Sequence, residues 1–415
     1  MYDRTLKNTI TEMSDFFYVL LLTGPRQVGK STLLDMCNKD GRNFVTLDDP
    51  EIRLLAQTEP SLFMQKYPPP ILIDEIQYAP SLFSYIKMKV DQEKKNGLYW
   101  LTGSQKFHLM KGVFESLAGR IGIVDLLGLS QAELDNRYNK VLPFLPTSNW
   151  VENARNNSKD KKTLHDIYAQ IWIGSFPKLI SKLKDKSSKF DKKSRDNFYS
   201  SYLQTYIERD VKALANVKYS NAFLIFMRTV AARTSQILNV NDIANKSNID
   251  AKTAKNWLSI LEASGLVYFL YPYGANTTKR LTKKPKLYFL DTVLASYITR
   301  WETPASLEDG AMSGAILETH LFTEILKSYW HNGLEAYFYY YRDFDQKEVD
   351  LLIEQDNTLY PIEFKKTGNP SRSINSNFKA LNNLDKDIGN GAIICFVEDD
   401  LPVTKEITAI PVYYL

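Results

Sequence analysis

Cysteine and histidine are scarce in this sequence. Only two cysteines, Cys37 and Cys395, and four histidines occur among 415 residues, and they form no CxxC motif and no Cys/His cluster. This excludes a disulfide scaffold and a zinc-finger protein, and it indicates a reducing compartment. Membrane-length apolar runs are also lacking, and the first ten residues have no signal-peptide core. We therefore expect a cytoplasmic protein that does not associate with membranes.

A strong net charge is lacking as well. The 52 basic and 48 acidic residues give a net charge of +4, and the hydrophobic content of 44% is that of ordinary globular proteins, which excludes wholesale disorder. At ~100–200 residues per domain, the chain is long enough for several domains. A near-neutral total still permits contact with nucleic acid, provided that basic residues cluster locally.

Short apolar runs alternate with helix-length segments in the first third of the chain. These runs lie at residues 17–22, 44–47, 71–73, 98–101 and 121–127. Buried strands separated by helices predict a parallel sheet covered on both faces, which closes near Ser130. Beyond it, we expect residues 150–163 to form a loop and the charged stretch 182–193 to form a solvated loop or helix face.

A phosphate-binding motif follows the first of these runs. The segment GPRQVGKS, residues 24–31, fits G-x-x-x-x-G-K-[ST] and lies between a predicted strand and a predicted helix, as the motif requires. Lys30 is expected to reach the β- and γ-phosphates of ATP, and Ser31 to hold Mg²⁺. The expected nucleotide-binding residues are Gly24, Pro25, Arg26, Gln27, Val28, Gly29, Lys30, Ser31 and Thr32.

Two further predicted strands end in polar residues. Asp74 and Glu75 follow the apolar run at 71–73, where Asp74 can orient Mg²⁺ and Glu75 can activate the attacking water as a general base. Ser104 and Gln105 end the next strand, and either can sense the γ-phosphate or hold the water; we favour Ser104. Together with the loop, these residues predict ATP binding and hydrolysis.

Two arginines are candidates for an arginine finger. Arg120 lies just before the fifth predicted strand, and Arg209 lies in the segment YIERDV. Either can stabilise transition-state charge in a neighbouring subunit, although Arg120 fits a surface salt bridge equally well. A finger acting in trans implies a homo-oligomer, for which a hexameric ring is one form.

The ordered motifs resemble a prokaryotic group of AAA+ ATPases. The segments GPRQVGKSTLL, ILIDEIQ, LTGSQ, SLAGR and GLSQAEL carry the resemblance, and GSFP and YIERDV extend it over nearly the whole chain. Ser175 departs from the glycine that we expect in the family. The resemblance implies an AAA+ type sheet, ATP hydrolysis and a C-terminal region of unknown function.

A helix–turn–helix pattern follows at residues 240–258. Asn241 or Asp242 is expected to cap its first helix and Asp250 its second, and a strand and a basic hairpin then complete a winged helix. The same fold also serves as a protein-interaction or lid module, but the basic hairpin favours DNA. The expected DNA contacts are Lys252, Thr253, Lys255, Asn256, Lys279, Arg280, Lys283 and Lys284.

The last part of the chain contains a D…ExK pattern. Asp350 lies on one predicted strand, and alternation puts Glu363 and Lys365 on one face of the next. Two carboxylates can bind Mg²⁺, Lys365 can orient a water or the scissile phosphate, and Glu318 or Glu324 of the upstream helix can add a ligand. The pattern resembles the restriction-endonuclease-like nucleases, a superfamily whose members also persist as DNA-binding or structural domains.

We therefore predict an α/β protein of four parts. These are an AAA+ P-loop ATPase domain at 1–130, a helical connector or lid at 131–217, a winged-helix domain at 218–300 and a restriction-endonuclease-like domain at 301–415. The predicted function is Mg·ATP hydrolysis coupled to remodelling or processing of DNA, with branched or Holliday junctions among the candidate substrates. Two alternatives stay open: a nucleotide-controlled switch that binds DNA or protein with little turnover, and an ATP-gated, Mg²⁺-dependent nuclease.

Overall fold

The N-terminal part is built on a sheet of five parallel strands. We describe a computed structural model, which covers residues 2–39, 41–104, 109, 113, 115–184, 192–206, 220–274, 283–370 and 375–415. The strands are β1 (Val19–Thr23), β2 (Asn43–Thr46), β3 (Ile71–Asp74), β4 (Tyr99–Gly103) and β5 (Ile121–Asp125), in the order β2-β3-β4-β1-β5. The five predicted strands are confirmed, and the central β1 is buried along its whole length.

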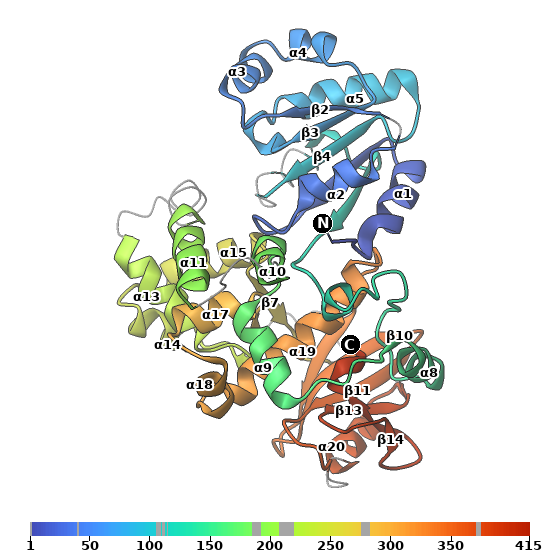
Figure 1. The fold of residues 1–415 in the computed structure, drawn as a ribbon, viewed down its shortest axis with the longest axis vertical. Coiled ribbons are helices and arrows are strands. Elements are labelled where there is room, and N and C mark those ends of the chain that lie inside the picture. Colours follow the sequence, from blue (N-terminus) through green and yellow to red (C-terminus); the bar gives the residue numbers. More distant parts are fainter. Residues whose placement is uncertain are drawn as a thin grey trace.

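Helices cover both faces of this sheet (Figure 1). They are α1 (Leu6–Phe16), α2 (Lys30–Cys37), α3 (Pro50–Thr58), α4 (Pro60–Lys66) and α5 (Leu82–Glu93), with a short 3₁₀ helix η1 at Ile76–Tyr78. Alternate residues of β1 enter two separate cores: Leu20 packs with α1 and α2, and Leu21 packs with α3, α4 and α5. This two-sided burial explains why the strand is apolar throughout.

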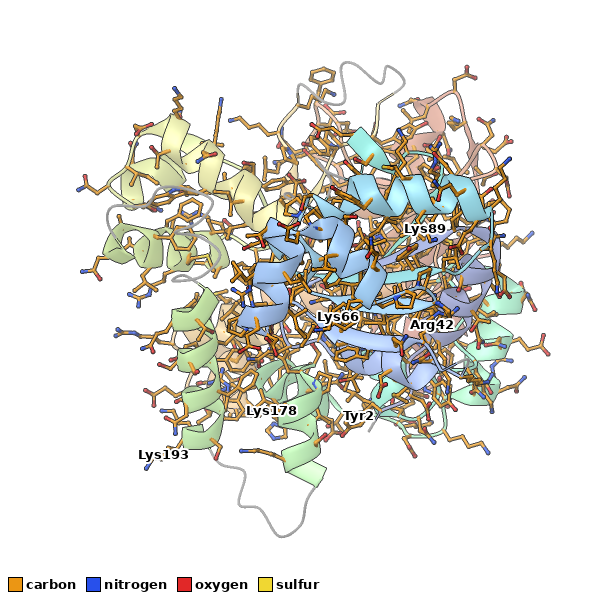
Figure 2. All side chains as sticks on the ribbon, turned by 90° about the horizontal axis from the view of Figure 1, so that it is seen from above. Tyr2, Arg42, Lys66, Lys89, Lys178 and Lys193 are labelled. Carbon is orange, nitrogen blue, oxygen red and sulfur yellow. The ribbon has the colours of Figure 1, made fainter. Side chains whose placement is uncertain are left out.

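A helical segment follows the sheet. It contains α7 (Gln131–Leu134), α8 (Ser148–Asn157), α9 (Leu164–Ile173), α10 (Pro177–Lys184) and α11 (Lys192–Tyr206). The prediction of a loop at 150–163 is wrong for its first half, because Thr147 caps α8 and Trp150 and Val151 are buried on its inner face. Figure 2 shows Lys178 of α10 and Lys193 of α11 on helices beside the N-terminal part.

The next elements contain the predicted helix–turn–helix. They are α13 (Ser220–Ala231), β6 (Gln236–Ile237), α14 (Val240–Lys246), α15 (Ala251–Ala263), β7 (Val267–Leu270) and β8 (Lys286–Phe289), followed by α17 (Thr292–Ile298) and α18 (Pro304–Asp309). Strand β8 pairs antiparallel with both β6 and β7. Asp250 caps α15 as predicted, but Asn239 rather than Asn241 or Asp242 caps α14, because the helix already begins at Val240.

The C-terminal part is a mixed sheet backed by a long helix, α19 (Ser313–Trp330). Its elements are β9 (Phe338–Arg342), β10 (Glu348–Gln355), β11 (Thr358–Phe364), α20 (Asn375–Lys379), β12 (Asp387–Ile388), β13 (Gly391–Cys395), β14 (Leu401–Pro402) and β15 (Ile407–Pro411), with 3₁₀ turns η4 (Ala380–Asn383) and η5 (Val412–Tyr414). The order is β14-β15-β13-β11-β10-β9, and β12 pairs with β11. The helix predicted upstream of Asp350 and the two strands predicted around Asp350 and Glu363 are confirmed as α19, β10 and β11.

One apolar core runs through all of these parts. It includes Leu6 of α1, Leu33 of α2, Trp257 of α15, Leu321 of α19 and Ile394 of β13. The parts are therefore packed against one another rather than joined by linkers alone. Among the described residues, no helix combines the length and the apolar character needed to cross a membrane.

Candidate nucleotide-binding site

The loop between β1 and α2 has the backbone shape of a phosphate cradle. Gly24 has a φ of 141°, and a Cβ atom there would overlap the carbonyl oxygen of Leu126. Gln27 and Gly29 also have positive φ angles, of 62° and 93°. The turn delivers the chain to the N-terminus of α2, where free backbone N–H groups and the helix dipole attract anions. Residue 24 must therefore be glycine for this loop to form.

Lys30 and Ser31 begin α2, and their side chains bind different partners. The Lys30 ammonium donates to the carbonyl oxygens of Gly24 and Pro25, at 3.0 and 2.8 Å. The Ser31 hydroxyl donates to Asp74 Oδ1 at 2.5 Å. The lysine thus folds over the loop that a triphosphate would occupy, and phosphate oxygens would compete with these carbonyls for its charge.

Asp74 collects hydroxyl groups from neighbouring elements. Besides Ser31, the hydroxyls of Thr102 and Thr46 donate to its carboxylate, the latter at 3.3 Å. The prediction missed the two threonines, although both lie at the carboxyl ends of strands that pair with β3 or lie next to it. Hydroxyl and carboxylate oxygens are the hard ligands that Mg²⁺ prefers, so this donor set fits the ion.

Glu75 turns from the end of β3 toward the same site. It adopts a left-handed conformation with a φ of 56°. Its Oε2 accepts from Gln77 Nε2 and, at 3.4 Å, from the hydroxyl of Ser104 at the end of β4. The structure thus places Ser104 beside Glu75. Its role toward the γ-phosphate or the water stays a prediction, and Gln105 lies outside the described residues. Gln77 was missed, although it follows the acidic pair by two residues.

A cleft of about 600 Å³ joins these groups. Its lining residues are Arg26, Gln27, Gly29, Lys30, Ser31, Thr32, Glu75 and Thr205. Three predicted nucleotide-binding residues, Gly24, Pro25 and Val28, do not line it, and Val28 is 2% exposed. Thr205 lies on α11, so the helical segment supplies one wall of the cleft, which the sequence motifs did not indicate.

Family comparisons assign this part of the chain. Residues 17–135 match the family described as an AAA domain. The N-terminal part is an AAA-type P-loop ATPase domain. Residues 164–305 and 313–415 match two families described as domains of unknown function, DUF8612 and DUF4143. The AAA domain thus precedes two regions whose family descriptions state no activity.

Two relatives and several solved structures are similar to most of the chain. Uncharacterized proteins of Mycobacterium bovis and Mycobacterium tuberculosis are each 27% identical over 398 residues, covering 95% of this chain and 80% of theirs. The Walker-type ATPase of Pyrococcus abyssi is 15% identical, with a TM-score of 0.43, 72% of this chain and 96% of that chain covered. The Thermotoga maritima Holliday junction branch migration motor is 12% identical, with a TM-score of 0.31, 63% of this chain and 88% of that chain covered.

The two arginine-finger candidates lie away from this cleft or outside the described residues. Arg120 precedes β5, whose first residue pairs with the first residue of β1, so it lies at the edge of the AAA sheet opposite the phosphate loop. Its guanidinium binds Asp91 of α5, with a shortest distance of 2.6 Å. Arg209 is not among the described residues. A role in trans stays a prediction for both.

The candidate DNA-contacting residues of α15 face outward. Lys252, Lys255 and Asn256 are exposed, while Trp257 packs into the core. The Thr253 hydroxyl is engaged with the capping Asp250, at 2.7 Å. Lys283 and Lys284 are exposed just before β8, whereas Lys279 and Arg280 lie outside the described residues. DNA binding by these residues stays a prediction.

The C-terminal part brings together the predicted nuclease-like residues. Lys365 Nζ lies 2.6 Å from Glu363 and 3.8 Å from Asp350. The backbone N–H of Phe364 donates to Asp350 at 3.0 Å, which ties β10 to the end of β11. Burial, followed by the charge of Asp350, raises the pKa of Glu363 to about 8 and that of Glu318 to about 7.

An unpredicted lysine lies among the carboxylates of Glu318, Glu348 and Asp350, which together with Glu363 we call the acidic cluster. Lys286 of β8 is 3% exposed in its side chain, and its Nζ lies 2.5 Å from Glu348, 3.4 Å from Glu318 and 3.6 Å from Asp350. Within the described ranges, no three His, Cys, Asp or Glu side chains are placed to hold a metal ion. The metal-binding role of Glu318, Asp350 and Glu363 stays a prediction, and two of these carboxylates pair with Lys286 in the structure.

Glu324 does not belong to this cluster, contrary to expectation. It is buried on another face of α19, where it accepts from the backbone N–H of Gln131 at 2.7 Å and pairs with Lys327 at 2.8 Å. Glu324 lies six residues after Glu318, a rotation of about 240° around the helix axis. The two glutamates therefore face different neighbours.

Proposed function

We propose that the AAA domain binds Mg·ATP and hydrolyses it. The observation that carries the proposal is the contact between Ser31 at the start of α2 and Asp74 at the end of β3, beside a cleft that also exposes Glu75. Lys30 and the N–H groups of the loop would bind the phosphates, and Ser31 and Asp74 would hold magnesium. Magnesium supplies positive charge that offsets the charge of the phosphate oxygens.

Glu75 would take the proton from the attacking water. A general base must lie within hydrogen-bond reach of that water, and Glu75 lines the cleft with its carboxylate steadied by Gln77 and Ser104. Its left-handed backbone lies just after β3, so Glu75 is outside the extended strand that ends at Asp74. One carboxylate would thus hold the ion and its neighbour would accept the proton.

The test is phosphate release by Glu75→Gln. Because loss of a general base costs about 10²–10⁴-fold in rate, we expect turnover to fall by that range while the affinity for a fluorescent ATP analogue changes less than threefold. Glu93→Gln on the far helix α5, where Glu93 pairs with Lys89, is the matched control and should keep full turnover. Turnover of Glu75→Gln equal to that of the parent would exclude this residue as the base.

We further propose that hydrolysis is coupled to remodelling of DNA, with branched junctions among the substrates. The support is the exposed side chains of Lys252, Lys255 and Asn256 on α15 and the exposed lysines before β8. Measuring the rate of ATP hydrolysis with single-stranded, duplex and four-way-junction DNA tests this. Stimulation that is lost in Lys252→Glu/Lys255→Glu, but kept in Lys246→Glu on α14, supports it. Absence of stimulation by every DNA favours a nucleotide-controlled switch.

Homo-oligomerisation belongs to the same proposal. An arginine at residue 120 or 209 would complete the site of a neighbouring subunit and supply positive charge to the transition state. Sedimentation of the chain with and without ATP tests this. A monomer at all concentrations and nucleotide conditions would exclude a finger in trans.

A second candidate is an ATP-gated nuclease in the C-terminal part. It is favoured by the convergence of Asp350, Glu363 and Lys365, and it is opposed by the insertion of Lys286 among the carboxylates. Mg²⁺-dependent cleavage of DNA that disappears in Asp350→Ala would support it. Intact DNA with every substrate, with and without ATP, would exclude it.

A further inference from the structure

A buried arginine joins the phosphate loop to the rest of the molecule. Arg4 lies in the segment before α1 and is 4% exposed. Its guanidinium donates to the carbonyl oxygen of Val28 in the phosphate loop at 3.0 Å, and to those of Leu127 and Gly128 after β5 at 2.8 and 3.2 Å. Its Nε donates to Glu133 at 3.0 Å. One side chain therefore holds the loop against the segment that leaves the sheet.

Glu133 anchors Arg4 in this position. Its carboxylate also accepts the backbone N–H groups of Thr5 and Ser130, each at 2.9 Å. Burial alone would raise the pKa of Glu133, but the charge of Arg4 and the surrounding donors hold the pKa well below its ordinary value. The carboxylate is therefore charged at neutral pH. A charge-assisted pair of this kind, whose other lone pairs also accept hydrogen bonds, holds both side chains in one fixed position.

His331 connects the pair to α19. The backbone N–H of Leu127 donates to His331 Nε2 at 3.3 Å, so the proton of the neutral ring is on Nδ1, which lies 3.5 Å from Glu133. Burial lowers the pKa of His331, although the charge of Glu133 opposes this. The ring thus links the carboxylate of one part of the chain with a helix of another.

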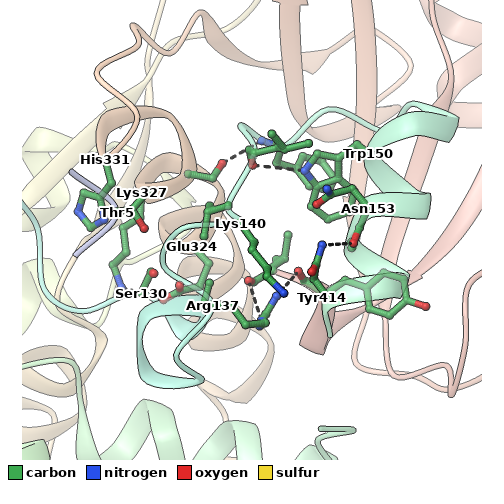
Figure 3. Close-up of a pocket in the computed structure, with 18 residues that line it drawn as sticks. Thr5, Ser130, Arg137, Lys140, Trp150, Asn153, Glu324, Lys327, His331 and Tyr414 are labelled. Carbon is green, nitrogen blue, oxygen red and sulfur yellow. Dashed lines mark hydrogen bonds and ion pairs between the residues drawn. The ribbon is translucent and has the colours of Figure 1, made fainter. Parts of the chain in front are cut away.

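Helix α19 holds the segment after β5 at three points. Each contact joins a side chain of the helix, or of its C-cap residue His331, to the backbone of that segment: His331 to Leu127, Lys327 to Leu129 at 2.9 Å, and Glu324 to Gln131 at 2.7 Å. Figure 3 shows Glu324, Lys327 and His331 beside Ser130 and Thr5, around a cavity of about 30 Å³, which has room for water. Residues 324, 327 and 331 share one face of the helix.

We propose that Arg4 is a positioning residue of the nucleotide site, and that it transmits nucleotide occupancy from Val28 to α19. The proposal rests on ATP binding by the AAA domain. A triphosphate would draw the N–H groups of the loop toward itself. Because the Arg4 guanidinium bonds to three carbonyls and a carboxylate at once, a shift of Val28 would also move these other partners. Glu318 lies six residues and about 9 Å before Glu324 on α19. The same helix therefore extends from the segment that Arg4 binds after β5 to the carboxylates around Lys286.

The test compares Arg4→Met with Arg42→Met in the full-length chain. Arg42 (labelled in Figure 2) is the matched control, because it also binds a backbone carbonyl, that of Gly97 at 3.1 Å, and covers the ring of Trp100. It lies just before β2, at the end of the AAA sheet opposite the phosphate loop. We expect Arg4→Met to raise the dissociation constant of a fluorescent ATP analogue at least tenfold. Arg42→Met should change it less than twofold, and Arg4→Lys should give an intermediate value.

Hydrogen exchange supplies a readout that a purely structural role would not move. In the parent, ATP should increase the protection of residues 313–331 at least threefold, and this response should be lost in Arg4→Lys. If Arg4→Met does not fold, Arg4→Lys decides alone. Parental affinity together with parental protection in the folded variant would overturn the proposal. A parent chain that does not bind the ATP analogue would instead overturn the proposed ATPase function.

Discussion

Replacing Lys286 by methionine tests whether this lysine neutralises the acidic cluster and thereby stabilises the folded chain. The ammonium lies within 4 Å of Glu348, Glu318 and Asp350, and its side chain is 3% exposed. Methionine keeps the length of the side chain and removes the charge. Breaking a buried ion pair on one side costs about 3–5 kcal/mol, because the partner charges stay behind unpaired. This is a large fraction of a typical stability of about 5–15 kcal/mol.

The cost should depend on pH in a defined direction. The pKa of Glu318 is raised from 4.5 to about 7 even with Lys286 present. Between these two pH values, Glu318 therefore keeps its proton in the folded state but has lost it in the unfolded chain. Stability therefore falls as the pH rises from about 4.5 to about 7, by about 3 kcal/mol for this group. Without the ammonium the pKa of Glu318 rises further. The variant should then be weakened most at pH 8 and least at pH 5.5.

The assay is urea unfolding of the parent and of Lys286→Met at both pH values, with Lys284→Met as the control. Lys284 is exposed two residues away, and its replacement should leave the midpoint unchanged. A loss in Lys286→Met that is equal at pH 5.5 and pH 8, or no larger than that of the control, would refute the assignment of Lys286 as the cation of this cluster.

Two further predictions concern the nucleotide cleft. Gly24→Ala should abolish binding of a fluorescent ATP analogue and lower the melting temperature, because the new Cβ would overlap the carbonyl of Leu126. Gly41 also has a positive φ, of 66°, but open space around it, so Gly41→Ala should keep binding. Thr205→Glu should weaken binding of the ATP analogue at least tenfold, because it places a negative charge in the wall of the cleft. The control is Gln204→Glu, since Gln204 is the preceding residue of α11 but does not line this cleft, and it should have little effect. Equal affinities of the two variants would show that α11 does not border the triphosphate.

Local patterns were sufficient to predict the AAA sheet and much of its site. Apolar runs marked its strands because both faces of the sheet are covered, and the motif residues Lys30, Ser31, Asp74 and Glu75 lie at strand and helix ends that the parallel arrangement brings together. In the C-terminal part, alternation along β11 correctly placed Glu363 and Lys365 on one side, where their side chains contact each other.

Contacts between distant elements could not be predicted in this way. Lys286 reaches the acidic cluster from β8, and nothing in its local sequence distinguishes it from the exposed Lys284. Thr205 borders the nucleotide cleft only because α11 packs beside the AAA domain. The helix α8 was missed for another reason: its sequence is polar, and it is stabilised by the Thr147 cap and the burial of Trp150.

The shared apolar core has a consequence for how the chain can be divided. Helices α1 and α2 of the AAA domain contribute Leu6 and Leu33 to the same core as Leu321 of α19 and Ile394 of β13. A fragment ending near residue 130 would leave this side of its sheet in water, and it would also lose α11 from its cleft. The family comparison thus marks the AAA domain as a separate region, but in the structure this domain shares one core with the rest of the chain, so its stability depends on the whole chain.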